Sequence, residues 1–243
     1  MHESCKTGRR AFIRAAGAVG GALLLAGCGP KTPSAGRTGS SPSDTPKSAE
    51  DVSPPEDLMR EHGVLRRILL IDAEILRRLD ANQDFPPGAL ADAAVIIRTF
   101  IEDYHEKLEE DFLFPRFRKA NRLVDLVDVL LEQHKAGRRL TDVVTRLADL
   151  QALQLPDSRR MLADSLGRFI RMYSPHAARE DTVLFPALHE IVAADEYDAL
   201  GDDFEKKEHD LFGDDGFEKI VDRVATIEKT LGIYDLTQFT PRE

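Results

Sequence analysis

Residues 105–115 read His-Glu-Lys-Leu-Glu-Glu-Asp-Phe-Leu-Phe-Pro, and residues 176–186 read His-Ala-Ala-Arg-Glu-Asp-Thr-Val-Leu-Phe-Pro. Both stretches contain His-x3-Glu, a second acidic residue and then Leu-Phe-Pro, at an offset of 71 residues. Upstream of each, the pattern His-x3-Arg-Arg occurs at His62 and again at His134, an offset of 72 residues. The chain therefore contains one helical hairpin twice, with histidines at matching positions.

The hydrophobic periodicity between these motifs is helical throughout. It predicts four long helices, at residues 56–81, 89–114, 122–150 and 157–185. Proline cannot continue a regular helix, so we expect Pro115 and Pro186 to end the second and fourth helices, and Pro175 to kink the fourth. Short connections favour an all-α, antiparallel up-down four-helix bundle within residues 55–243. Further helical segments at 195–212 and 217–231 predict a C-terminal cap over about residues 195–232.

The repeated histidines lie on the apolar faces of their helices. Residues four apart on a helix share a face, so His105 lies beside Glu109 and His176 beside Glu180. His62 follows the leucine stripe of the first helix, and His134 follows that of the third. Buried polar side chains need partners, and a buried carboxylate needs a strong one.

A metal centre satisfies this requirement, and the repeat suggests a pair of ions. One ion would lie between His62 and His105 and the other between His134 and His176, with Glu109 and Glu180 placed to bridge them. Two imidazoles and a carboxylate with open positions suit non-haem iron, and manganese is an alternative. Structural zinc prefers four closed ligands, commonly with thiolate. The competing interpretation is a polar core network without metal. The candidate ligands are His62, His105, Glu109, His134, His176 and Glu180.

At these residues the sequence resembles the hemerythrin-like family, whose HHE cation-binding domain has a histidine on each helix and His-x3-Glu on the second and fourth. The resemblance covers residues 55–193. It implies a four-helix bundle with a non-haem di-iron centre in proteins that bind or sense dioxygen, handle iron, or act in oxidative and nitrosative stress. Oxygen carriers of this type place a second histidine one turn from the first on the third helix, where this chain has Leu130 and Arg138. Glu106, Glu110 or a water could fill that position, although both glutamates lie off the His105 face.

Three functions remain open at this point. The first is a di-iron protein that binds oxygen, another diatomic gas or iron itself. The second is an enzyme with the same centre, such as a peroxidase or oxidase, and the third is a structural lipoprotein without metal. Of the remaining histidines, we expect His189 at the surface and His209 to cap the bundle or supply an outer hydrogen bond, with a ligand role as the less favoured alternative.

The N-terminal 54 residues differ in composition from the body. A basic segment with Arg9-Arg10 precedes an apolar run of residues 15–26, too short to span a bilayer, so residues 1–27 predict an export signal. The paired arginines resemble a twin-arginine signal, and a general secretory signal is the alternative. The sequence of residues 25–28, Leu-Ala-Gly-Cys, resembles a bacterial lipobox, which predicts lipidation of Cys28 and anchoring of an exported protein that faces the periplasm or cell exterior. Residues 28–54 predict a disordered tether.

Charge and cysteine content exclude other classes. The chain has 33 basic and 43 acidic residues, a net charge of −10, and without residues 1–27 the balance is 29 against 42. Such an acidic chain lacks the electrostatic footprint for nucleic acid and a cationic face for anionic lipid, so membrane contact is expected through the anchor only. The cysteines are Cys5 and Cys28, which excludes a disulfide scaffold or thiolate metal site in the body.

Overall fold

The computed structural model describes residues 52–241, and the regular structure in that range is entirely helical. The all-α prediction is confirmed. The expected signal, tether and lipid-attachment residue Cys28 lie outside the described residues.

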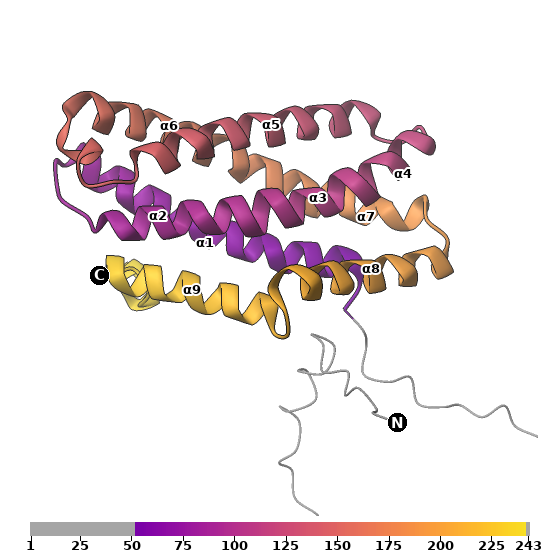
Figure 1. The fold of residues 1–243 in the computed structure, drawn as a ribbon. Coiled ribbons are helices and arrows are strands. Elements are labelled where there is room, and N and C mark those ends of the chain that lie inside the picture. The colour runs from indigo at the N-terminus through magenta and orange to yellow at the C-terminus, as the bar shows by residue number, and fades with distance from the viewer. Residues whose placement is uncertain (1–51, 242–243) are drawn as a thin grey trace, which may run out of the picture. The chain divides into compact units, whose positions relative to one another are not determined.

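Four long helical rods lie side by side and form an antiparallel up-down bundle (Figure 1). The first rod is α1 (Pro54–Asp80) and the third is α5 (Val124–Leu147). The second is built from α2 (Pro87–Ile96), η2 (Ile97–His105), α3 (Glu106–Leu108), η3 (Glu109–Leu113) and α4 (Phe114–Lys119). After a short 3-10 turn, η4 (Ala152–Gln154), the fourth contains α6 (Pro156–Arg179), η5 (Glu180–Leu184), α7 (Phe185–Ala187) and η6 (Leu188–Glu190).

The first rod begins two residues earlier than the sequence pattern predicted. Ser53 precedes the helix, and its backbone N–H donates to the Glu56 carboxylate at 3.0 Å. Pro54 occupies the first helical position, where its missing N–H costs nothing. The predicted tether therefore extends too far at its C-terminal end, because Ser53 is the N-cap of α1 and Pro54 already belongs to the helix.

The predictions that Pro115 and Pro186 end their helices are wrong. Both prolines follow a π-helical turn, η3 or η5, in which the last N–H bonds five residues back: Phe114 to Glu109 and Phe185 to Glu180. A proline ring normally clashes with the carbonyl four residues earlier, and the wider turn changes which carbonyl lies there. The second rod therefore runs on to Lys119 and the fourth to Glu190. Helix α6 also passes through Pro175 without interruption.

The C-terminal helices α8 (Ala194–Phe212) and α9 (Gly216–Leu231) pack along the side of the bundle formed by α1 and α2, as Figure 1 shows. Phe100 of the second rod contacts Phe212 and Phe217, with ring centroids 5.6 and 6.3 Å apart. Arg67 forms an ion pair with Glu228 at 2.6 Å. A short 3-10 turn, η7 (Leu236–Phe239), follows. The predicted cap is present, and it covers the first hairpin.

Between residues 52 and 241, no helix is both long enough and apolar enough to traverse a lipid bilayer.

Candidate metal centre

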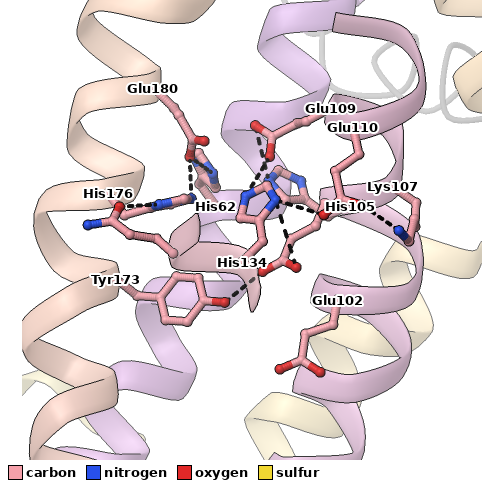
Figure 2. Close-up of polar contacts among 12 residues, drawn as sticks. His62, Glu102, His105, Lys107, Glu109, Glu110, His134, Tyr173, His176 and Glu180 are labelled. Carbon is pink, nitrogen blue, oxygen red and sulfur yellow. Dashed lines mark hydrogen bonds and ion pairs between the residues drawn. The ribbon is translucent and has the colours of Figure 1, made fainter. Parts of the chain in front are cut away.

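The six candidate ligands come together in the centre of the bundle, one histidine from each rod and one glutamate from each of the second and fourth (Figure 2). His62, His134, Glu109 and Glu180 have no exposed surface, while His105 and His176 are exposed by 2% and 4%. Six polar side chains have therefore been withdrawn from water together. Their desolvation requires strong compensation within the site.

The imidazoles form two neighbouring pairs. The ring centroids of His62 and His105 lie 4.7 Å apart, and those of His134 and His176 lie 5.1 Å apart. One pair joins the first and second rods, and the other joins the third and fourth. This is the arrangement expected from the duplicated hairpin.

Each carboxylate approaches both pairs (Figure 2). A Glu109 oxygen lies 3.9 Å from Nε2 of His105, and the other lies 3.4 Å from Nε2 of His134. Glu180 Oε2 lies 3.3 Å from Nε2 of His62 and 3.0 Å from Nε2 of His176. Glu109 therefore belongs to two groups whose ligand atoms lie within 4.8 Å of one another, one with His62 and His105 and one with His134, His176 and Glu180.

The inward atoms lack conventional partners. Within residues 52–241, no hydrogen bond of good geometry reaches the carboxylate oxygens of Glu109 and Glu180 or the Nε2 atoms of His62, His105 and His134. Buried polar atoms are rarely left in this state. Nitrogen and oxygen lone pairs that converge on one region, with no hydrogen-bond donor between them, are suited to ligate a cation.

The outward nitrogen, Nδ1, of each of these four histidines has a hydrogen-bond partner. Each Nδ1–H donates to an oxygen on a neighbouring rod, and we call these four acceptors the outer partners. The bonds join His62 to Asp181 (2.6 Å), His105 to Glu61 (2.8 Å), His134 to Glu110 (3.1 Å) and His176 to Gln133 (2.9 Å). An acceptor at Nδ1 fixes the tautomer that leaves Nε2 with a free lone pair, as in metal-binding histidines.

Burial dominates the electrostatics of the imidazoles. It lowers the pKa of His134 to about 4, although Glu110 opposes the shift. Burial also acts to lower the pKa of His62, but the hydrogen bond to Asp181 and the nearby Glu180 carboxylate outweigh it and raise the pKa to about 9. Without a cation this ring therefore holds a proton on Nε2, which a bound metal ion would displace.

The two carboxylates differ from each other. Burial, followed by the charge of Glu180, raises the pKa of the Glu109 carboxyl well above its usual value. At Glu180 burial acts in the same direction, but His176 and His62 outweigh it and lower the pKa. Two carboxylates this close and this buried are costly to ionise together unless positive charge lies between them.

Glu106 and Glu110, the glutamates considered as replacements for the missing histidine, lie beside Nδ1 of His134. Glu110 is the outer partner of His134, and the Glu106 carboxylate lies 4.0 Å from the same Nδ1. Arg138 contacts both glutamates, at 2.7 Å and 2.8 Å. Arg138 thus occupies the position one turn from His134 and pairs with acids, and it faces away from the open side of the imidazoles.

The remaining histidines lie outside the centre. His189 is exposed, as expected, and its Nε2 lies 2.8 Å from the Tyr197 hydroxyl. His209 is also exposed and pairs with Asp214 at 3.3 Å, so it supplies no hydrogen bond to the ligands. The interpretation of His209 as an outer partner is wrong, because it lies on the solvent-facing side of α8.

Three of the outer partners were not identified from the sequence: Asp181, Glu61 and Gln133. The repeat contained the signal. Each of the two glutamates is followed by an acid, Glu110 or Asp181, and the histidines of the first and third rods are preceded by Glu61 and Gln133.

Tyr173 of the fourth rod packs closely against the third rod and contacts residues of the site. The Tyr173 hydroxyl donates to Glu106 Oε1 at 2.6 Å, and its ring meets His176 edge-on at 5.2 Å between centroids. The phenol passes over Gly137, where a Cβ atom would lie 1.9 Å from the hydroxyl oxygen. Glycine is therefore required at position 137 to seat Tyr173.

Comparison with known proteins agrees with this site. The model of the hemerythrin HHE cation-binding domain matches residues 53–188 and again residues 127–238. The chain therefore belongs to the hemerythrin HHE cation-binding domain family.

Curated relatives include the uncharacterized protein Rv1995 of Mycobacterium tuberculosis and the uncharacterized protein Mb2018 of Mycobacterium bovis. Each is 47% identical over 234 residues, which cover 96% of this chain and 91% of the relative. No solved structure matches the chain.

Replacing Gly137 by alanine is expected to destabilise the bundle by about 1–3 kcal/mol, because the methyl group displaces Tyr173 from a packed core. Thermal unfolding followed by circular dichroism should show a loss of several degrees. Gly167→Ala is the matched control. Its Cβ would meet Leu76 at an ordinary 3.9 Å, so it should gain roughly 0.5–1 kcal/mol from helix propensity. Equal melting temperatures for the two variants would contradict this role of Gly137.

Proposed function

We propose that this protein is a non-haem di-iron protein that binds or senses dioxygen or a related diatomic molecule. The family and the His/Glu groups establish a cation-binding domain; iron, the number of ions and the ligand are our proposal. The observation that carries it is the set of four imidazoles, each with Nδ1 bonded outward and Nε2 directed at two shared, buried carboxylates.

The donor set supports iron over other metals. Four imidazoles and two carboxylates would give each position two nitrogen ligands and shared oxygen, a mixture that suits Fe(II) and, as an alternative, Mn(II). Thiolates, which favour structural zinc, are absent from residues 52–241. His62 and His105 would hold one ion, and His134 and His176 the other. Glu109 and Glu180 would join the two and balance their charge.

The protein's own residues would control access and geometry. The outer partners hold the four rings in place, and Tyr173 and Phe185 pack against His176 and His62. Bound iron would supply reversible one-electron chemistry and open positions for a small ligand. A centre rich in imidazole carries less negative charge than one rich in carboxylate, which favours ligand binding over the formation of highly oxidised states.

The two positions can be tested by substitution. His62→Ala and His134→Ala should each reduce the iron content from about two ions per chain to about one, at different positions. Glu109→Ala or Glu180→Ala should weaken both ions, because each carboxylate contacts both imidazole pairs. His189→Ala is the matched control and should keep the full content. Iron per chain is measured on protein reconstituted anaerobically with Fe(II); wild-type protein that holds a single ion, or prefers zinc, refutes the paired centre.

Reaction with oxygen separates a binding protein from an enzyme. The iron-loaded protein would be reduced anaerobically, exposed to dioxygen and degassed while its visible absorption is followed. We expect rapid reaction and gradual oxidation over repeated cycles, because the third rod lacks the second histidine of the oxygen carriers. Complete recovery over many cycles would indicate a carrier. Rapid catalytic consumption of peroxide would favour the peroxidase alternative.

We further propose that the protein is exported and anchored by a lipid on Cys28, through the twin-arginine route suggested by Arg9-Arg10. The lipobox pattern at residues 25–28 supports this location. Cys28→Ser should move the protein from the membrane fraction to the soluble fraction, or leave the precursor uncleaved, as judged by fractionation and mass spectrometry. Unchanged membrane partitioning of this variant would rule out the lipid anchor.

A further inference from the structure

The two halves of the metal centre are related by the sequence repeat, and most of their surroundings match. His62 and His134 correspond, and so do their outer partners, Asp181 and Glu110. Each of these acids also contacts an arginine of the rod that carries the histidine, Arg66 in one half and Arg138 in the other. An arginine–carboxylate–imidazole chain is thus present twice.

The second histidine of each half breaks this match. His105 donates to the carboxylate of Glu61, whereas His176 donates to the amide oxygen of Gln133, the residue at the corresponding position. Glu61 has no exposed surface and also accepts from the Tyr104 hydroxyl at 3.0 Å. Gln133 is only partly buried. One imidazole therefore faces a charged acceptor in the protein interior, and its counterpart faces a neutral one.

This difference changes the donor strength of the rings. Hydrogen bonds to an ionised acceptor are about twice as strong as those between neutral groups, and a carboxylate behind a ligating imidazole raises its basicity. His105 should consequently be a stronger ligand than His176. Its carboxylate also adds a negative charge on the side of His62 and His105.

Glu106 is a further difference, because the matching position in the second half of the repeat is Ala177. It does not compensate for the missing carboxylate behind His176. Its carboxylate lies beside His134, but Arg138 contacts it at 2.7 Å and the Tyr173 hydroxyl donates to it. Lys107 also contacts Glu110, the outer partner of His134. On the side of His134 and His176, contacts from Arg138 and Lys107 therefore offset the extra acid Glu106, and His176 itself keeps a neutral partner.

We propose that the two metal positions are functionally unequal because of the Glu61/Gln133 difference. The position between His62 and His105 retains its ion, and the position between His134 and His176 exchanges its ion. Glu61 is a positioning residue that acts through His105. This inference rests on the proposed paired metal centre and adds an exchangeable ion to it.

The test is competition with a chelator on the full-length protein loaded anaerobically with Fe(II) and, separately, with Co(II). Wild-type protein should release its ions in two phases, with affinities that differ by about ten- to a hundredfold, the range typical of a lost outer partner. Glu61→Gln should weaken the tighter phase towards the other. Gln133→Glu should tighten the weaker phase, and the double exchange should transfer the tight position to His176.

Further variants identify the positions and exclude a structural effect. His105→Ala should retain only the weakly held ion, and His176→Ala only the tightly held one. Tyr104→Phe removes the second contact of Glu61 and should keep both phases, which separates the charge of Glu61 from its packing. Circular dichroism verifies that each variant is folded.

Two results overturn the proposal: a single release phase from wild-type protein that holds two ions, or biphasic release that Glu61→Gln leaves unchanged. Failure of the wild-type protein to bind a pair of ions is a different result. It refutes the paired centre itself, and with it the basis for unequal positions.

Discussion

The four outward hydrogen bonds of the histidines are the interaction on which the rest of the structure depends. They link the first rod to the fourth, the fourth to the third, the third to the second and the second to the first, and so close a ring around the bundle. Each bond fixes an imidazole that would otherwise be a costly polar group in an apolar core. The same bonds direct four lone pairs inward, so the feature that holds the rods in register also prepares the cation site.

Duplication explains the geometry of the centre and also its departures from symmetry. The π-helical turns η3 and η5 each begin at a candidate carboxylate ligand and each precede Phe-Pro. Such turns often occur at functional sites because they shift the direction of a side chain within a continuous helix. The two halves differ around this shared core: Glu61 corresponds to Gln133 and Glu106 to Ala177, and the C-terminal helix pair packs mainly on the first hairpin.

The sequence was sufficient to predict the helical bundle and the six residues that meet at its centre, because hydrophobic periodicity and the repeat both report local geometry. It failed at Pro115 and Pro186, where a widened turn accommodates a residue that ordinarily ends a helix. It also left Asp181, Glu61 and Gln133 unassigned. Their contacts depend on which rods are neighbours and on how the rods are rotated, and a helical pattern in one segment does not specify either.

Anomalous diffraction at the iron absorption edge, from crystals of protein reconstituted anaerobically with Fe(II), tests the central claim most directly. Two peaks are expected, one between His62 and His105 and the other between His134 and His176, with Glu109 and Glu180 in contact with both. A single peak, peaks at other residues, or density that responds only at the zinc edge would contradict it.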